Sequence, residues 1–476
     1  MTSTLRTDSL SGKQYDLAVI GAGSAGFSAA ITATEAGAQV ALIGQGTIGG
    51  TCVNVGCVPS KTLIRAMEAV SHGERASRFA GIEGDGHLAN WNALRRQKDE
   101  LVDTLRRSKY IDLLPAYNGI AYLEGGARLD KGAVSLNGER VEAGTIIIAT
   151  GSHASVPSIP GLGKVPYLTS TTAFEIDELP RSLLMIGGGY IGCELAQMFA
   201  RAGVAVTLLF RSRLLPDAEP EISEGLTGYL AEDGIAVRKV RDYRKVCTVA
   251  GGIALSVQDE DGDETLEAER LLLSTGRRAN TRGLGLQQAG VALAPNGGIR
   301  VDERMRTTRP GIYAAGDVTG RDQFVYMAAY GAKIAAANAL NGDTLVYDNT
   351  AMPAVVFTDP QVASVGLTEA MARDRDLDVA TTVLPLDHLP RALAARDTRG
   401  LIKLVAERAT KKLLGAHILA PEGADAIQTA ALAIKHGMTY IELAEMIFPY
   451  LTTVEGLKLA AQTFEADVSK LSCCAG

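Results

Sequence analysis

Two glycine-rich stretches, each set between an apolar strand and a helix, constrain the fold of this 476-residue chain more than any other feature. Residues 21–26 (GAGSAG) follow the apolar run 15–20 and precede an alanine-rich helix that extends to about residue 37. Residues 187–192 (GGGYIG) repeat the pattern after the run 181–186. A strand, a tight glycine turn and a helix in this order form the dinucleotide-binding fingerprint, with the pyrophosphate at the helix N-terminus. The sequence therefore predicts an α/β chain with two Rossmann-like dinucleotide-binding domains.

The ends of the second strands distinguish the two predicted sites. In the first unit, the acidic residue that normally holds the ribose would fall at Gly44, with Gln45 as its only polar neighbour. The ribose contact of this site must therefore be weaker or supplied by another residue. In the second unit the strand 204–210 is followed by Arg211 and Arg213, and two guanidinium groups at this point suit a 2′-phosphate. We expect this second site to prefer NADPH over NADH.

A pair of cysteines directly after the first unit indicates redox chemistry. Cys52 and Cys57 are five residues apart and would point away from each other on a regular helix. Gly56 between them permits a distorted first turn, and Pro59 removes a backbone donor there. The N-terminus of the following helix favours thiolate over thiol. We interpret Cys52 and Cys57 as a redox-active dithiol.

The bulk properties exclude several classes of function. Lys and Arg total 47 against 54 Asp and Glu, giving a net charge of −7, and no basic patch recurs that would indicate nucleic-acid binding. No apolar run approaches the roughly 20 residues of a membrane span, and the N-terminus lacks the apolar region of a signal peptide. We therefore expect a cytoplasmic protein. Six cysteines in this length are too few for a disulfide framework, and Cys193 and Cys247 are interpreted as structural thiols.

The remaining patterns set the domain limits. Residues 72–120 are predicted to be helical with a solvated charged face that includes Lys98, and apolar strands end in glycine turns near 151, 276 and 316. Beyond residue 351, strands at 353–357, 400–406 and 413–419 precede helices that begin at 424 and 440. Two dinucleotide folds with a redox dithiol imply an electron path from nicotinamide through a flavin to the cysteines, so the flavin is assigned to the fold that precedes them. The predicted divisions are a polar lead-in (1–14), an FAD-binding domain (15–151 and 281–348), an NADPH-binding domain (152–280), a C-terminal α+β dimerisation domain (349–466) and a tail (467–476).

The motifs GGTCVNVGCVPSK, ATG and GIYAAGD, together with the two glycine stretches, resemble the pyridine nucleotide–disulfide oxidoreductase family across residues 15–465. The resemblance implies that Cys57 lies nearest the flavin and that Cys52 is the exchanging thiol. It also implies an ion pair of Lys61 with Glu194 beside the flavin N5, and a ring, Tyr190, that gates the nicotinamide pocket. The cofactor-binding positions are then Gly21, Gly23, Ala25, Gly26, Gly46, Gly50, Thr51, Lys61, Ala127, Gly151, Asp317 and Val325 for FAD, and Gly187, Gly189, Tyr190, Arg211, Arg213 and Gly276 for NADPH.

One position departs from the disulfide reductases of this family. They carry His-Pro-Thr-x-x-Glu near the C-terminus, and the histidine protonates the departing thiolate. Here the matching residues 450–455 are YLTTVE, so Tyr450, with a reference pKa near 10, takes the place of the acid. Such a chain is poorly equipped to cleave disulfides, although it could reduce another acceptor.

The tail suggests that acceptor. Cys473 and Cys474 are adjacent, too close for an unstrained disulfide, and soft thiolates select soft metal ions. The stretches FPYLTTVEGLKLAAQTF and LSCCAG, together with GTIGGTCVNVGCVPSK, resemble the mercuric reductase branch of the family. This resemblance implies a homodimer in which Cys473 and Cys474 of one subunit deliver Hg(II), bound as a thiol complex, to Cys52 and Cys57 of the other for reduction to Hg(0). It further places Tyr450 and Tyr110 at the metal site.

Competing interpretations remain open at this point. A thioredoxin-reductase-like enzyme would also use a C-terminal cysteine pair but needs the histidine acid. A lipoamide dehydrogenase would account for neither the cysteine tail nor the arginines at 211 and 213. A thiol buffer that only sequesters soft metals would leave two nucleotide sites unused. Quinones or oxygen as natural acceptors would make Hg(II) incidental.

Overall fold

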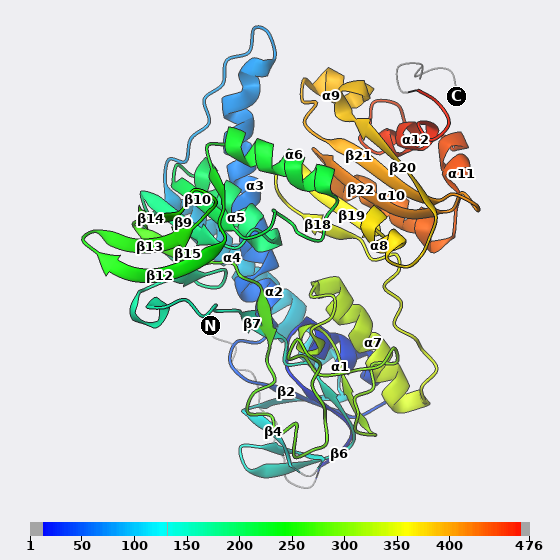
Figure 1. Cartoon of the computed structure of the whole chain (residues 1–476). Coiled ribbons are helices and arrows are strands. Elements are labelled where there is room, and N and C mark those ends of the chain that lie inside the picture. The colour runs from blue at the N-terminus through cyan, green and yellow to red at the C-terminus, as the bar shows by residue number, and fades with distance from the viewer. Residues whose placement is uncertain (1–12, 131, 468–476) are drawn as a thin grey trace.

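The computed structural model describes residues 13–130 and 132–467. Its first sheet has the order β3-β2-β1-β6-β5-β4, and an additional strand pairs with β6. The strands β1 (Gln14–Ile20), β2 (Val40–Gly44), β3 (Ile120–Glu124), β6 (Glu139–Ile148) and β17 (Ile312–Ala314) are parallel, whereas β4 (Ala127–Asp130) and β5 (Ala133–Leu136) form an antiparallel extension. The helices α1 (Ser24–Glu35) and α7 (Val325–Asn341) pack together beside this sheet, at the bottom of Figure 1. Residues far apart in the sequence thus complete one dinucleotide fold.

A second parallel sheet repeats the design. Its order is β11-β10-β9-β15-β8, and it carries the second glycine stretch between β9 and α5. The bounds are β8 (Leu168–Thr169), β9 (Ser182–Ile186), α5 (Tyr190–Arg201), β10 (Ala205–Phe210), α6 (Pro220–Glu232), β11 (Ala236–Lys239) and β15 (Arg270–Leu273). An antiparallel meander, β12 (Asp242–Val249), β13 (Gly252–Gln258) and β14 (Asp263–Ala268), lies beside it, and β7 (Ser152–Ala154) pairs with β16 (Arg277–Ala279) where the two sheets connect.

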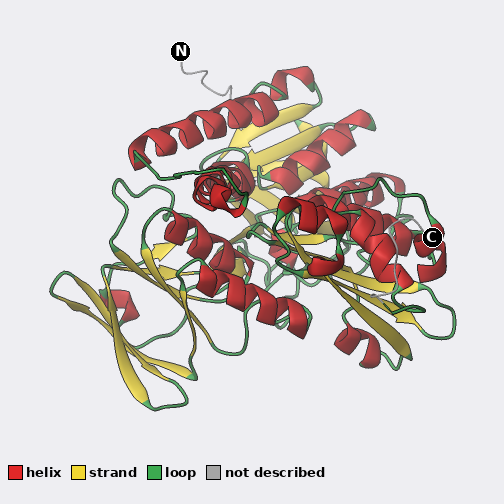
Figure 2. Ribbon diagram, turned by 90° about the horizontal axis from the view of Figure 1, so that it is seen from above, coloured by secondary structure: helices red, strands yellow, loops and turns green. Residues whose placement is uncertain are grey.

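The C-terminal part is a five-stranded antiparallel sheet with helices packed along it. The strand order is β18-β19-β22-β21-β20, and buried side chains of α10 and α12 join its apolar core. The bounds are β18 (Ala354–Val356), β19 (Gln361–Gly366), α8 (Glu369–Arg373), β20 (Val379–Pro385), α9 (Pro390–Ala395), β21 (Leu401–Glu407), β22 (Leu413–Ala420), α10 (Gly423–Lys435), α11 (Tyr440–Glu445) and α12 (Glu455–Gln462). Figure 2 shows the helices lying against the sheets.

The region predicted to be helical from 72 to 120 is interrupted. Helix α3 (Cys57–Glu74) and a short 3₁₀ turn end at Arg78, residues 82–90 are irregular, and α4 (Trp91–Arg106) follows. Its charged face is not fully solvated: Lys98 is 1 % exposed and donates to the Glu175 carboxylate and to the Phe174 carbonyl. The region expected to be helical thus consists of separate helices with an irregular segment between them. The expectation of a solvated face fails at Lys98, whose burial is acceptable because its charge is paired.

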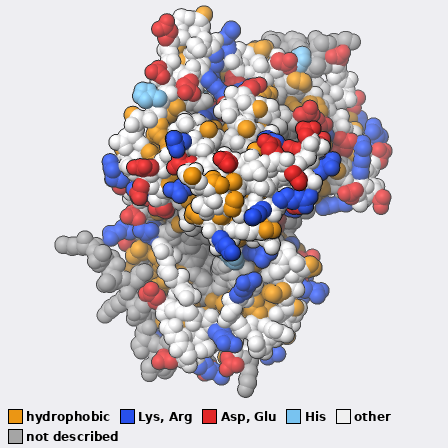
Figure 3. All heavy atoms as spheres, turned by 60° about the vertical axis from the view of Figure 1, so that its left-hand side comes forward, with side chains coloured by type: hydrophobic (Ala, Val, Ile, Leu, Met, Phe, Trp, Pro, Cys, Tyr) orange, Lys and Arg blue, Asp and Glu red, His pale blue; other side chains and the backbone are white. Residues whose placement is uncertain are grey.

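Charged side chains of both signs cover the face of the molecule in Figure 3. On the face shown in Figure 3, lysine and arginine side chains are interspersed with aspartate and glutamate rather than gathered into a basic field. Within the described residues, no helix combines the length and apolar character needed to cross a membrane.

Candidate active site: a dithiol beside two dinucleotide cradles

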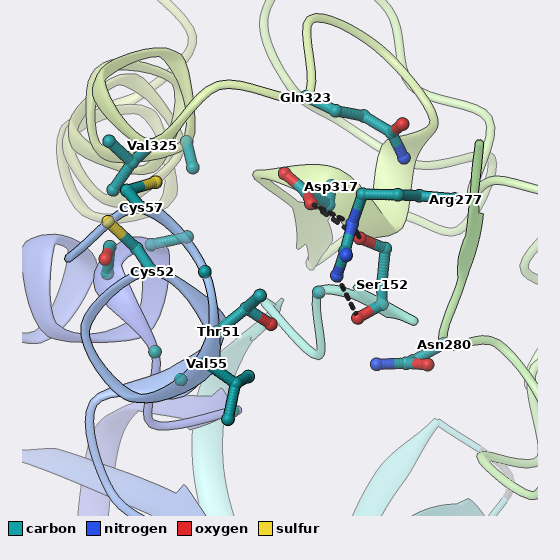
Figure 4. Close-up of a pocket in the computed structure, with 18 of the residues that line it drawn as sticks. Thr51, Cys52, Val55, Cys57, Ser152, Arg277, Asn280, Asp317, Gln323 and Val325 are labelled. Atoms are coloured by element: carbon teal, nitrogen blue, oxygen red, sulfur yellow. Dashed lines mark hydrogen bonds and ion pairs between the residues drawn. The ribbon is translucent and has the colours of Figure 1, made fainter. Parts of the chain in front are cut away.

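A cavity of about 1070 Å³ lies where the three sheets meet. It is lined by the turn between β1 and α1, by the cysteine-bearing helices, and by the segment around β16. In Figure 4 the cysteine pair lies on one side of this cavity, and Asp317, Ser152 and Arg277 lie on the other. The volume exceeds what one drug-sized ligand needs and suits an extended cofactor.

The first glycine turn fits a dinucleotide. A Cβ built on Gly26 would lie 1.7 Å from the Gly21 carbonyl oxygen, so helix α1 can approach the turn only with glycine there. The N-cap of α1 is Gly23, which offers no side-chain hydrogen bond, and Gly23, Ser24 and Ala25 line the cavity at the start of the helix. Such a helix N-terminus binds the pyrophosphate of a dinucleotide.

The cysteine helices are packed directly onto this cradle. Gly50 has a φ of +69°, and a Cβ on it would lie 2.7 Å from the Gly23 Cα, so only glycine permits the contact. The Gly49 N–H also donates to the Ala22 carbonyl at 2.9 Å. These contacts fix α2 (Gly50–Val55) beside the expected pyrophosphate position.

A break at Gly56 brings the two thiols together. The backbone at Gly56 (φ −125°, ψ −111°) ends α2 and starts α3 with Cys57 as its first residue. Cys52 and Cys57 are both free thiols, and they lie side by side in Figure 4. The predicted distortion at the glycine is confirmed, and it occurs as a division into two helices rather than as a distorted first turn.

The two thiols differ in acidity. The hydrogen bond from Cys52, together with the Lys61 ammonium, lowers the pKa of Cys57 to about 7. The same shared proton, together with burial, raises the pKa of Cys52. Cys57 is therefore the thiolate of the pair near neutral pH, and its position at the N-terminus of α3 favours that charge.

Lys61 is held by a buried carboxylate. Its Nζ lies 2.6 Å from Oε2 of Glu194, which is 4 % exposed, and 5.0 Å from the centre of the Phe357 ring. The other carboxylate oxygen of Glu194 accepts the Phe357 N–H at 2.9 Å. The pair predicted from the family pattern thus forms, and it joins the cysteine helix to α5 and to the end of β18.

The same face of α5 makes two further contacts with the C-terminal part. The Gln197 side chain donates to the Asp359 carbonyl at 2.9 Å and accepts the Asp359 N–H at 2.7 Å. One turn later, Arg201 binds the Asp359 carboxylate at 2.9 Å. Helix α5 is therefore attached to the C-terminal part along its length as well as at Glu194.

Sequence reasoning missed the network opposite the cysteines. Ser152 donates to Asp317 at 2.6 Å, and the Arg277 Nε donates to Ser152 at 2.7 Å and lies 3.7 Å from the Asp317 carboxylate. Burial lowers the pKa of Arg277, and the nearby Asp317 carboxylate opposes this effect. The only sequence signal for this network was that Arg277 directly follows the predicted glycine turn at 276.

The second glycine turn has the same construction as the first. A Cβ on Gly192 would lie 1.8 Å from the Gly187 carbonyl oxygen, whereas Gly189, the N-cap of α5, faces open space. Tyr190 lines the cavity beside it, with its ring 5.9 Å from that of Phe324. A second dinucleotide fits this cradle on the same grounds as the first.

The two arginines predicted to select NADPH differ. Arg213 donates to the carbonyls of Pro216 and Ala218, each at 2.7 Å, so its side chain organises the loop after β10. Arg211 is exposed at the end of that strand. Arg211 is therefore the better placed of the two to bind a phosphate, and neither lines the main cavity.

Of the two tyrosines predicted at the metal site, Tyr110 is close to the cysteines and Tyr450 is not. Tyr110, in the π-helical turn Arg107–Ile111, lies 3.2 Å from the Ser24 hydroxyl, and its pKa is raised by burial and by the nearby thiols. Tyr450 is 55 % exposed and does not line the cavity of its own chain. Cys473 and Cys474 lie outside the described residues. The predicted positions that do line the cavity are Gly21, Gly23, Ala25, Gly46, Gly50, Thr51, Cys52, Cys57, Lys61, Ala127, Gly151, Gly189, Tyr190, Glu194, Gly276, Asp317 and Val325.

Comparisons with known proteins agree with this construction. Residues 15–339 match the model of the pyridine nucleotide-disulphide oxidoreductases, and residues 352–461 match the dimerisation domain of the same proteins. The chain is 49 % identical to a mercuric reductase of Streptomyces lividans, over 97 % of this chain and 98 % of that protein. It is 48 % identical to a mercuric reductase of Shigella flexneri, over 97 % and 82 % of the two chains. The chain belongs to the mercuric reductase branch of the pyridine nucleotide-disulphide oxidoreductase family.

Solved structures place the fold in the same family. The HOCl-induced flavoprotein disulfide reductase RclA of Escherichia coli, solved as a Cu(II) complex, matches with a TM-score of 0.84 and 30 % identity, over 95 % of this chain and all of that chain. As a member of the pyridine nucleotide-disulphide oxidoreductases, the chain uses FAD and NADPH, and its two glycine cradles fit two dinucleotides.

Proposed function

We propose that this chain reduces Hg(II) to Hg(0) at the Cys52–Cys57 dithiol, with NADPH as the electron donor. The observation that carries the proposal is the dithiol itself, a thiolate and a thiol side by side at the wall of a cavity built for dinucleotides. The 45–49 % identity to several mercuric reductases over nearly the whole chain supports the same substrate. A reducing, NADPH-containing cytoplasm is the compartment that suits free thiols.

The reaction balances as NADPH plus Hg(II) giving NADP⁺, a proton and Hg(0). Bound FAD supplies the two-electron relay between nicotinamide and metal. The Cys57 thiolate is available as a soft ligand at neutral pH, and binding of the metal to Cys52 displaces the proton that its sulfur holds. Lys61 keeps the charge of Cys57, Glu194 keeps Lys61 in place, and the ring of Tyr190 closes over the nicotinamide side.

We assign the remaining positions in the same way. The first cradle (15–151 and 281–348) holds FAD, with Asp317 at its ribityl chain, and the second (152–280) holds NADPH, with Arg211 at its 2′-phosphate. The C-terminal part (349–466) forms the homodimer. Its segment from Met446 to Leu451 supports this assignment, because Ile447 is 97 % exposed and the side chains of Met446, Tyr450 and Leu451 are exposed as well.

The dimer gives Tyr450 a role that its own chain does not. Because Tyr450 lies outside the cavity of its own chain on the exposed apolar segment, we place it at the dithiol of a second copy. Tyr110, beside the cysteines of its own chain, completes the metal site. Two phenols and two thiolates can bind a soft metal without offering an acid to a leaving thiol.

Replacing both Cys473 and Cys474 by alanine tests the delivery of the metal. We expect a large loss, tenfold or more, when Hg(II) is presented as a bulky dithiol complex that cannot enter the cavity. With a small monothiol complex the loss should be slight. Rates of NADPH oxidation with the two complexes give the comparison, and an equal effect on both would contradict a role in delivery.

The change Tyr450→His tests whether the missing acid–base histidine accounts for the choice of acceptor. An imidazole with a pKa near 6.5 can protonate a leaving thiolate at neutral pH, whereas a phenol cannot. We expect slower Hg(II) turnover together with some disulfide reductase activity. The measurement is NADPH oxidation with each acceptor, and unchanged rates with both would remove Tyr450 from the site.

The proposed function is tested by NADPH oxidation with excess small thiol, with and without Hg(II), beside an oxidised-disulfide control. Oxidation that appears only with Hg(II), with release of mercury vapour, supports the proposal. Oxidation driven by the disulfide would instead favour a thioredoxin-reductase-like enzyme. Purified protein without bound flavin and without either activity would favour a thiol buffer.

A further inference from the structure

The first dinucleotide cradle lacks the acidic residue that usually binds the ribose, and the structure shows what fills its place. A Cβ built on Gly44, the last residue of β2, would lie 2.4 Å from the hydroxyl oxygen of Tyr122 and 2.9 Å from the Ala22 Cβ. The tyrosine side chain comes from the neighbouring strand β3 and lies across the end of β2. A side chain at position 44 would therefore require both the Tyr122 ring and Ala22 to move, so glycine suits this position.

The Tyr122 ring is buried, but its hydroxyl is not among the enclosed polar atoms and borders the cavity, and no hydrogen bond from it is seen among the described residues. The residue is 4 % exposed, and it lines the cavity together with Gly44 and Gln45. Burial and the nearby Glu124 raise its pKa, so the hydroxyl keeps its proton and remains a donor. A hydroxyl that borders the cavity at the end of β2 is therefore available to bind a ligand atom there.

We propose that the Tyr122 hydroxyl binds a ribose hydroxyl of the FAD adenosine in place of the missing carboxylate. The end of β2, one strand from the glycine turn, is where dinucleotide folds place the adenosine ribose. The phenol reaches this position from β3, so the contact is supplied across the sheet rather than along the chain. The proposal rests on the use of FAD and not on the identity of the metal substrate.

The substitution changes the character of the contact. A carboxylate forms a charge-assisted bond to a ribose hydroxyl, whereas a neutral phenol forms an ordinary one of roughly half that strength. We therefore expect adenosine binding in this chain to depend little on pH and salt. The Tyr122 hydroxyl should account for about a fivefold contribution to FAD affinity.

The first test measures FAD release from the holoenzyme on dilution, followed by the fluorescence of the freed flavin. Tyr122→Phe should raise the FAD dissociation constant about fivefold. The matched control is Tyr117→Phe, because Tyr117 is a half-buried tyrosine near β3 that does not line the cavity. Unchanged affinity in Tyr122→Phe, or an equal loss in the control, overturns the proposal.

Modified cofactors identify the atom that Tyr122 binds. Holoenzymes are reconstituted with FAD that lacks either the 2′- or the 3′-hydroxyl of the adenosine ribose. Wild type and Tyr122→Phe should bind one of these two analogues equally, because the partner hydroxyl is absent. A fivefold difference that persists with both analogues would assign the phenol a packing role and overturn the proposal.

A reciprocal substitution gives a result that packing alone does not predict. Gly44→Glu in the wild-type chain should weaken FAD binding, because the new side chain collides with the tyrosine. In a Tyr122→Ala background the same change should instead tighten FAD binding, because the phenol no longer obstructs the new carboxylate and only the Ala22 Cβ, 2.9 Å from the new Cβ, must shift. The same sign in both backgrounds contradicts the proposal. Neither NADPH nor mercury enters these measurements, so their outcome is independent of the metal reductase proposal.

Discussion

Cys57→Ala should abolish Hg(II) reduction, with the rate of NADPH-dependent mercury release falling roughly a thousandfold or more. Cys57 is the thiolate of the pair, and its partner Cys52 keeps a raised pKa and would be left as a single, largely protonated thiol. One thiol cannot supply the two sulfur ligands that hold the metal at the cavity wall. The measurement is mercury vapour released per NADPH consumed by flavin-loaded protein.

The control for this experiment is a thiol elsewhere in the chain. Cys247 is exposed on β12 and does not line the cavity, so Cys247→Ala should keep full activity. This position also corrects the expectation of a structural thiol, since an exposed sulfur contributes nothing to a core. A Cys57→Ala enzyme with more than a tenth of the original rate would show that other thiols carry the reaction.

Lys61→Met should have the second largest effect, on both stability and the pH profile. The ammonium favours the Cys57 thiolate in addition to the larger effect of the Cys52 thiol, so its removal should raise the pKa of Cys57 from about 7 by part of the shift. At pH 7 the thiolate fraction then falls, and the acid limb of the activity profile moves to higher pH. Thiolate absorbance at 240 nm, titrated against Cys57→Ala as the blank, reports the shift directly.

The same change leaves the Glu194 carboxylate buried with only the Phe357 N–H as a partner. Because Lys61 is partly exposed, the loss should be about 2 kcal/mol of unfolding free energy, between the values for surface and buried pairs. Lys61→Arg should recover much of the thiolate acidity. An unchanged acid limb in Lys61→Met would mean that the hydrogen bond from Cys52 alone sets the pKa of Cys57.

The elements that depend on local pattern were predictable from the sequence. The two glycine turns fix their strands and helices through short-range contacts, and the break at Gly56 follows from a residue type that tolerates it. The pair Lys61–Glu194 was placed by the family pattern, since no local rule links residues that far apart.

Contacts between distant segments could not be predicted. Arg277 and Ser152 meet only because β7 pairs with β16, and Lys98 is buried only because residues 174–175 cover it. Tyr122 fills the end of β2 because β3 is its neighbour in the sheet, a fact that the order of the strands determines and their sequences do not. The interruption at residues 82–90, by contrast, has a signal in the sequence, because Gly84 and Gly86 disfavour a helix and Asn90 caps the helix that follows.

Helix α5 carries a consequence for protein engineering. Glu194, Gln197 and Arg201 lie three to four residues apart on one face of the helix. They form hydrogen bonds and an ion pair with residues 357–359, which follow β18. The segment 152–280 therefore cannot be exchanged alone for that of a relative, although it forms a complete sheet of its own. A chimera that takes this segment from a relative must import a matching 357–359 loop, or it will misalign the lysine that activates the thiolate while leaving nucleotide binding intact.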